Sequence, residues 1–297
     1  RCSSNWPDGQ FLQTRAQFDC ARFVFLNAFY CEPELKRIAL GIQYDGTSWR
    51  GWQTQPDGKT VQDTLETALK KFSLADIATT CAGRTDAGVH ALEQVVHFDT
   101  DLDRDMFSWV RGVNAFLPAS IAVRWACEVA RDGNEQFHAR FSATARTYRY
   151  LLYNHPVRSP LLSGKAGWVF RPLTVETMQS AATYLIGVHD FTAFRAAECQ
   201  AKSPVKTMHE IRIERRGDLL VFTLRANAFL HHMVRNIVGS LIVVGSGNKQ
   251  PEWLKSVLEG KDRSRAAPTF MPDGLYLARI DYDPKWKLPH EPLFPLP

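Results

Sequence analysis

The sequence has no apolar run long enough to cross a membrane, because its uninterrupted apolar stretches stay below the roughly 18 to 20 residues that a spanning helix needs. Hydrophobic side chains make up 45% and charged side chains 23% of its 297 residues, which is ordinary for a globular chain. Cysteine is scarce: there are six, none in a C-x-x-C pair. This spacing excludes a disulfide framework or a cysteine zinc site and favours reduced thiols. We therefore expect a cytoplasmic protein without a membrane segment.

Motifs for cofactors, metals and serine hydrolases are absent or incomplete. Gly41 and Gly46 have phosphate-loop spacing, but Thr47 stands where that loop needs a lysine. His231 and His232 are adjacent, and on the helix expected there they would diverge by about 100°, which prevents both from binding one ion. No G-x-S-x-G motif is present. We expect neither a cofactor nor a bound metal.

Acidic residues dominate the first half of the chain and basic residues the second. Residues 1–135 hold 14 basic and 18 acidic side chains, net −4, whereas residues 136–297 hold 22 and 13, net +9. A basic half suits a polyanion, because Lys and Arg that neutralise phosphates release counterions. A solvated basic surface explains the same charge equally well, so charge alone does not decide the partner.

The hydrophobic pattern divides the chain into three parts. Residues 1–34 show no sustained period and are expected to form an N-terminal extension outside the core. Residues 35–135 and 136–297 each mix alternating strands with amphipathic helices, which predicts two α/β domains with a mixed or antiparallel sheet. Strands are expected near 36–44, 78–82, 94–98, 121–127, 146–153, 211–213, 220–224 and 275–282, with a turn at 217–218 between the strands near 211–213 and 220–224. Helices are expected near 61–72, 105–116, 174–186, 230–245 and 251–260.

One loop combines unusual chemistry with turn residues. The segment Gly83–Ala91 reads Gly-Arg-Thr-Asp-Ala-Gly-Val-His-Ala, with a guanidinium, a carboxylate and an imidazole beside two glycines. Glycines allow a tight turn and close approach of a ligand, and loops on a rigid sheet often hold catalytic groups. The alternative is an ordinary turn in which Asp86 accepts backbone N–H groups and pairs with Arg84.

Two further segments are compatible with RNA binding. Arg146–Tyr150 interleaves arginines with tyrosines, a composition that can stack a base and hold its phosphate. His231–Asn236 places Arg235 one turn after His231. Taken alone, Arg146–Tyr150 is better explained as a hydrophobic strand with extended arginines. Taken alone, His231–Asn236 is better explained as a helix surface with a solvated arginine.

Together these segments identify a family resemblance from about Lys36 to Tyr282: the sequence resembles tRNA pseudouridine synthase A. The string Gly-Arg-Thr-Asp-Ala-Gly-Val-His is highly specific to that family. The residues 1–34 are not required by the family pattern. The other matching stretches are Tyr44–Thr47, Gly51–Gln53, Phe137–Ala143, Arg146–Tyr150, Asp190–Thr192, Asn227–Asn236 and Gly274–Leu277.

The resemblance implies an isomerase that converts uridine to pseudouridine in the anticodon stem-loop, at positions 38, 39 and 40 of tRNA. The uracil is detached through nitrogen, rotated and rejoined through carbon, so the reaction needs no cofactor. The resemblance also implies two α/β domains sharing an extended, mostly antiparallel sheet flanked by helices, with an active-site cleft between them. The implied assembly is a homodimer that binds tRNA.

The resemblance also assigns residues. Asp86 matches the catalytic aspartate, which either attacks C1′ or removes a sugar proton, and the residues leave this choice open. Arg235 matches the arginine that keeps this carboxylate ionised, and Tyr148 the tyrosine that stacks on the uracil and takes a proton from C5. The expected substrate-binding residues are Arg84, Arg146, Tyr148, His231, His232 and Leu275.

Two rival functions use the same features. A non-catalytic RNA-binding module would share the basic face and the aromatics, but it has no use for a carboxylate facing a polyanion. A nucleoside hydrolase or glycosidase usually needs a second carboxyl group, and the Gly83–His90 loop carries only one. The family resemblance favours the isomerase over both of these functions.

Overall fold

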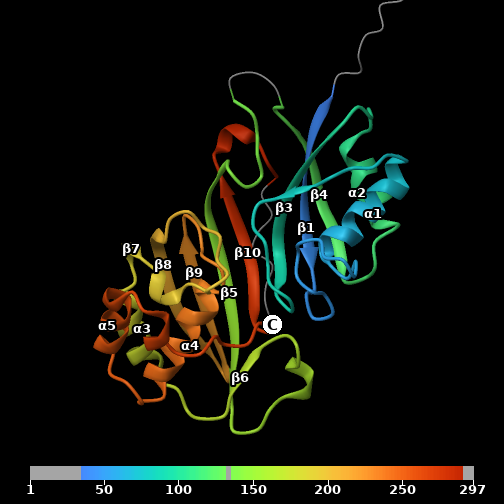
Figure 1. Ribbon diagram of the computed structural model, residues 1–297. Helices are drawn as coiled ribbons and strands as arrows, with labels where there is room; N and C mark the ends of the chain where they lie inside the picture. The colour runs from blue at the N-terminus through green and yellow to red at the C-terminus, as the bar shows by residue number, and fades with distance from the viewer. Residues whose placement is uncertain (1–34, 132–134, 290–297) are drawn as a thin grey trace, which may run out of the picture. The chain divides into compact units, whose positions relative to one another are not determined.

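A computed structural model describes residues 35–131 and 135–289 of the chain (Figure 1). The fold is mixed α/β, with a ten-stranded, mostly antiparallel sheet, as expected from the sequence. The N-terminal extension expected at residues 1–34 lies outside the described residues. Within the described residues, no helix is long and apolar enough to cross a membrane.

The sheet joins the two halves of the sequence through its last strand. Along the sheet the order is β4-β1-β3-β10-β5-β9-β8-β7, while β2 pairs with β3 and β6 with β5. The only parallel pairs among the described strands are β10 with β3 and β5 with β6. The strands are β1 Lys36–Tyr44, β2 Thr80–Cys81, β3 His90–Thr100, β4 Ile121–Val129, β5 Ala143–Asn154, β6 Gly167–Val169, β7 Gly187–Asp190, β8 Val205–Arg216, β9 Leu219–Ala226 and β10 Leu275–Tyr282.

The described residues form five α-helices beside the sheet, and the first two begin at side-chain caps. The Thr60 hydroxyl accepts the N–H of Asp63 at the start of α1, and Asp105 accepts that of Ser108 at the start of α2. Such caps satisfy backbone donors that a helix leaves unpaired at its N-terminus. The helices are α1 Val61–Ser73, α2 Met106–Asn114, α3 Val175–Thr183, α4 Met233–Gly245 and α5 Glu252–Gly260.

Two of the expected helices differ from the structure at their ends. Thr174 precedes α3, and its side chain makes no capping hydrogen bond. This helix ends at Thr183, before the expected residue 186, and Gly187 begins β7 with φ of +107°. The start of α4 matters most for the site, because this helix begins at Met233 and not at residue 230. His231 and His232 therefore precede the helix, and the divergence expected of them does not occur.

Two large hydrophobic clusters fill the interior. The first packs α1 and α2 against β1, β3 and β4, with Trp52 and Trp109 fully buried in it. The second packs α3, α4 and α5 against β5, β8 and β9, and includes Phe194 and Phe222. The first cluster also receives Leu277 of β10, while the second receives Leu275 from the same strand. The predicted boundary between two domains, at residues 135 and 136, stays a prediction.

Candidate active site

The Gly83–Val89 loop is clamped to the sheet at its first residue. The Gln94 side-chain amide of β3 donates to the Gly83 carbonyl, and its oxygen accepts the Gly83 N–H at 3.4 Å. Gln94 is fully buried, so this pair of hydrogen bonds satisfies a polar side chain that would otherwise be costly to bury. The clamp fixes where the loop leaves the sheet.

A second set of contacts fixes the middle of the loop. The hydroxyls of Thr85 and Tyr44 lie 2.7 Å apart and share a hydrogen bond, and the Thr85 carbonyl accepts the Trp52 N–H at 3.0 Å. Gly51 lies so close that a Cβ there would be 2.6 Å from the Thr85 oxygen, and its φ is +87°. Only glycine fits such a position without moving the loop.

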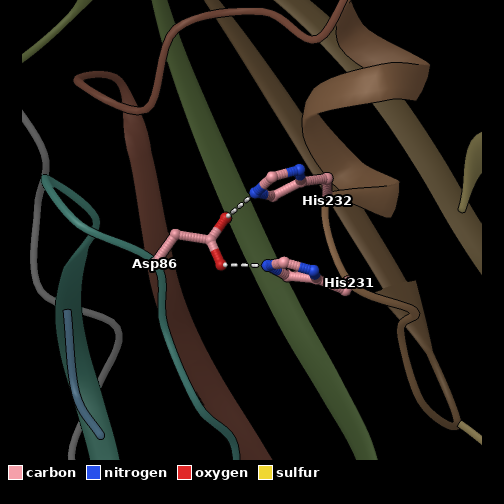
Figure 2. A group of neighbouring side chains, drawn as sticks. All are labelled: Asp86, His231 and His232. Carbon is pink, nitrogen blue, oxygen red and sulfur yellow. Dashed lines mark ion pairs between the residues drawn. The ribbon is translucent and has the colours of Figure 1, made fainter. Parts of the chain in front are cut away.

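The loop contains the tight turn that the sequence suggested, but the Asp86 side chain does not close it. The Val89 N–H donates to the Asp86 carbonyl at 3.1 Å, and Gly88 takes a positive φ of +79°. The Asp86 carboxylate points away from the turn and toward the segment before α4 (Figure 2). Its partners come from that segment and from α4, and Arg84 is not among those found in the described part of the chain.

The segment before α4 is held by its backbone. The Ala196 N–H donates to the His231 carbonyl at 3.0 Å, and the His231 N–H donates to the Cys199 sulfur at 3.4 Å. His232 adopts the left-handed conformation, with φ of 60° and ψ of 3°, which costs a non-glycine residue about 1–2 kcal/mol. This backbone turn places both imidazoles on the same side, with ring centroids 3.9 Å apart.

Three nitrogen groups converge on the Asp86 carboxylate. His231 Nε2 lies 3.2 Å from Oδ1, and His232 Nε2 lies 3.3 Å from Oδ2, so the two rings flank the carboxylate (Figure 2). Arg235 Nη1 donates to Oδ2 at 3.1 Å. The Asp86 side chain is 23% exposed and that of Arg235 13%. These partners thus compensate the negative charge of Asp86, and its carboxylate remains accessible to a ligand.

Arg235 is fixed at a second point. Its Nε–H donates to the Phe270 carbonyl at 2.8 Å, and the Phe270 N–H donates back to the Arg235 carbonyl at 3.4 Å. The guanidinium therefore reaches Asp86 from a defined position at the first turn of α4. A lysine could not reproduce both contacts, because the planar fork supplies two separate donors.

Burial shifts the pKa of two neighbouring groups. It lowers the pKa of His232; the Asp86 carboxylate opposes this shift, and the Arg235 guanidinium adds to it. His232 is therefore neutral at pH 7, and its contact with Asp86 requires the proton on Nε2. Burial also raises the pKa of Tyr148, and the Asp86 charge adds to this shift.

Tyr148 lies beside the loop, on β5. Its register partners are Leu224 of β9 and Leu277 of β10, and its ring meets that of Phe229 edge-on at 5.0 Å. The phenol oxygen lies 3.9 Å from the position a Cβ would take on Gly83. Tyr148 therefore borders the same loop as Asp86, and its phenol keeps its proton at neutral pH.

The Arg146 guanidinium donates hydrogen bonds to backbone carbonyls of the protein. Nη1 donates to the carbonyl of Asn227 at 2.9 Å, and Nη2 to those of Arg140 at 2.6 Å and Ala82 at 3.3 Å. These hydrogen bonds join three segments: Ala82, which precedes the Gly83–Val89 loop; the turn that contains Arg140; and Asn227, which follows β9. The observed contacts are structural, and contact between Arg146 and RNA stays a prediction.

The remaining expected residues occupy different environments. Arg84 is exposed at the start of the loop and makes no hydrogen bond or ion pair with residues 35–131 or 135–289. Leu275 is 5% exposed, begins β10 and packs into the second hydrophobic cluster. Binding of substrate by Arg84, Leu275, His231 and His232 stays a prediction.

Sequence reasoning missed the residues that hold the site in place. Gln94 and Tyr44 clamp the loop, and Phe270 positions Arg235 through its backbone. A glutamine at a buried position of a strand is a usable signal, because a polar side chain there needs a partner. A backbone carbonyl leaves no such signal in a sequence.

The same site contains a set of metal-ligand groups. One ligand atom each from Asp86, His231 and His232 lies within 4.8 Å of the others. The sequence argument against this histidine pair assumed a helix at both positions, and that assumption is wrong.

Comparisons with known proteins identify the family of this chain. A sequence profile described as tRNA pseudouridine synthase matches residues 41–142 and 181–283. A tRNA pseudouridine synthase A of Herminiimonas arsenicoxydans is 73% identical over 254 residues, covering 86% of this chain and 92% of that protein. The enzyme of that name from Janthinobacterium sp. (strain Marseille) is 72% identical over 258 residues, with 86% and 95% covered.

The chain thus belongs to the tRNA pseudouridine synthase family, whose members are isomerases acting on tRNA. Among solved structures, an archaeal box H/ACA sRNP Nop10–Cbf5 complex has 11% identity and a TM-score of 0.31, covering 77% of this chain and 59% of that one. At that TM-score the likeness carries no weight for fold or function.

Proposed function

We propose that this protein isomerises uridine to pseudouridine at positions 38, 39 and 40 in the anticodon stem-loop of tRNA, without a cofactor. The observation that carries the proposal is the contact of Asp86 with Arg235 at 3.1 Å. These residues are 149 positions apart in the sequence, and both match the family at its catalytic positions. A partly exposed carboxylate beside a guanidinium that is only 13% exposed is the arrangement that this chemistry needs.

The proposed role of Asp86 requires the ionised form. Whether the carboxylate attacks C1′ or removes a sugar proton, only its anion can donate the electron pair. Removal from water disfavours that anion, and a neighbouring cation and hydrogen-bond donors restore it. Arg235, His231 and His232 supply one charge-assisted contact and two further nitrogen contacts. The target base must leave its stack to reach this group, at a cost of a few kcal/mol.

Tyr148 is proposed to stack on the flipped uracil, opposite Leu275. Its raised pKa keeps the phenol protonated at pH 7, which suits stacking better than proton abstraction from C5 by the resting enzyme. Arg84, exposed at the entrance to the loop, is proposed to contact the RNA backbone, where a guanidinium can bind a phosphate in a bidentate manner.

The decisive assay is tritium release from C5-labelled uridine in anticodon-arm RNA. We expect release by the wild type and none by Asp86→Ala, with RNA binding retained by the variant. Formation of free uracil without pseudouridine would instead indicate a hydrolase, and RNA binding without either product a non-catalytic module. Substrate RNAs with single uridines at 38, 39 or 40 test the proposed positions separately.

The cytoplasmic location and the homodimer are proposals that rest on the family, as are two α/β domains with the active-site cleft between them. Light scattering of the purified chain, alone and with one equivalent of tRNA per dimer, tests the assembly. A monomer in both measurements would contradict it. Fractionation of cells that produce the protein tests the location.

A further inference from the structure

We propose that Asp86, His231 and His232 form a binding site for a zinc-like divalent cation, and that the bound ion inhibits the enzyme by occupying its carboxylate. The existence of the site is independent of the proposed isomerisation. The inhibitory effect rests on that proposed function, because it assumes that Asp86 must be free to act on the substrate.

The donor set selects the class of ion. Two imidazole nitrogens and one carboxylate oxygen are ligands that Zn²⁺ and neighbouring transition metals prefer, and catalytic zinc sites commonly use three protein ligands. Mg²⁺ and Ca²⁺ prefer oxygen ligands, and this group offers oxygen from one residue only. The site therefore favours Zn²⁺ over the alkaline-earth ions that accompany RNA.

The spacing of the donors is close to that of a metal site. Tetrahedral ligands with bonds of about 2.0–2.1 Å are roughly 3.3 Å apart. His231 Nε2 lies 3.2 Å from Asp86 Oδ1, and His232 Nε2 lies 3.3 Å from Oδ2. The three ligand atoms lie within 4.8 Å of one another. An ion needs only small side-chain rotations to contact all three.

The two imidazoles are arranged before any ion arrives. The backbone of His231 is fixed by Ala196 and Cys199, and the left-handed conformation of His232 turns both rings toward Asp86 (Figure 2). Side chains already held in place lose little conformational entropy on binding. Adjacent histidines on a helix could not provide this pair, so the late start of α4 creates the site.

The charge of Arg235 limits the affinity. Its guanidinium contacts Oδ2 at 3.1 Å, so the ion is expected to take Oδ1 and to leave the ion pair intact. The carboxylate then bridges two cations. The resulting binding is reversible, as expected of an inhibitor and not of a resident metal.

Binding is tested on the full, metal-free chain by titration with Zn²⁺ in competition with a chromophoric chelator. We expect one equivalent to bind, and His231→Gln, His232→Gln or Asp86→Asn to weaken it at least tenfold. The matched control is His209→Gln, an exposed histidine of β8, which should bind like the wild type. Equal affinity in wild type, His231→Gln and His232→Gln would overturn the site.

Cobalt distinguishes this site from the cysteines. Co²⁺ bound at nitrogen and oxygen ligands shows visible d–d bands without thiolate charge-transfer bands in the near ultraviolet. Strong thiolate bands, unchanged by His231→Gln, would place the ion at cysteines and overturn the assignment. Unfolded variants are recognised by circular dichroism, and Co²⁺ spectra of the wild type decide the ligand type without any variant.

Inhibition is tested by tritium release at increasing Zn²⁺. Activity should fall in parallel with occupancy of the site and return when EDTA is added. Loss of activity on chelation, restored by Zn²⁺, would make the ion a cofactor and overturn the inhibitory role. If no condition yields isomerisation, the proposed function fails, while the titration and the cobalt spectrum still decide whether the site exists.

Discussion

Two aspartates of this chain each face a histidine and a cation, and they differ in where their partners come from. Asp45 accepts hydrogen bonds from the N–H and hydroxyl of Thr47, at 3.1 and 2.6 Å, and pairs with Lys165. The Asp86 side chain has no hydrogen bond to a neighbour in its own loop within the described residues; its partners are His231, His232 and Arg235.

The histidines differ as well. Near Asp45, His90 uses Nδ1 to accept the Gly46 N–H at 3.0 Å and Nε2 to contact the Asp273 carbonyl at 3.0 Å. Its Nδ1 therefore has no proton to offer Asp45. Near Asp86, both histidines direct Nε2 at the carboxylate. Asp45 thus accepts hydrogen bonds from its own turn in addition to its ion pair with Lys165, which suits a role in stabilising the fold. The side-chain partners of Asp86 in the described residues all come from distant segments, which suits a role in chemistry.

The largest effect that tests this comparison is expected for Asp86→Asn. The amide cannot supply the anion, so turnover should fall on the order of 10⁴-fold or more, as for other essential catalytic groups. Folding and RNA binding should be retained, because no hydrogen bond of the loop uses this side chain. Tritium release, thermal unfolding and a filter-binding assay measure the three quantities. Measurable isomerisation by this variant would remove Asp86 from its role.

Arg235→Lys should have the next largest effect. Lysine keeps the charge but loses either the contact with Asp86 or that with the Phe270 carbonyl, and we expect turnover to fall about 100-fold, or ~2.7 kcal/mol. Single-turnover rates measure the loss. The control is Arg225→Lys, an arginine paired with Asp281 outside the site. Near-normal turnover of Arg235→Lys would contradict the ion-pair account.

A buried histidine away from both aspartates should give the protein an acid-sensitive stability. Burial lowers the pKa of His97 from 6.5 to about 4, and Arg37 and His138 add to the shift. The unfolded chain binds the extra proton between these values, so stability is highest above pH 6.5 and falls as the pH drops to 4, by an amount on the order of 3 kcal/mol.

Urea unfolding at several pH values measures this dependence, with His97→Gln as the comparison. Glutamine can still accept the Ala139 N–H that His97 Nδ1 accepts at 3.2 Å, but it does not titrate. In the variant, the free energy of unfolding should lose the part of its decrease between pH 6.5 and 4 that His97 causes. An unchanged slope would mean that His97 is not the titrating group.

Asp45→Asn should have the smallest effect. Burial opposes ionisation of Asp45, but hydrogen bonds from Lys165 and Thr47 prevail and lower its pKa from 3.8 to about 2. Because the side chain is 44% exposed, solvent screening reduces the expected loss of stability to ~1 kcal/mol. This contribution is present above pH 3.8 and is lost as the pH falls toward 2. Turnover should stay within about twofold; a loss comparable to that of Asp86→Asn would erase the distinction between the aspartates.

The sequence predicted most of the fold because its hydrophobic periods are regular. The strand expected near 36–44 is β1, and the helix expected near 61–72 is α1. The prediction failed at 230–232, because the helix expected from the apolar pattern begins at residue 230, three residues before the true start of α4. Periodicity cannot reveal a left-handed residue such as His232, since tertiary contacts to Ala196 and Cys199 hold the preceding turn.

The sequence alone identified the functional groups: one carboxylate in a glycine-rich loop, an arginine four residues after a histidine, and a family pattern that contains both. Tertiary structure alone decided which groups meet. Contacts between residues 149 positions apart depend on how β10 joins the sheet and on the backbone turn before α4. Local sequence specifies local conformation through side-chain periodicity, whereas the convergence of Asp86, Arg235 and two imidazoles depends on packing across the whole chain.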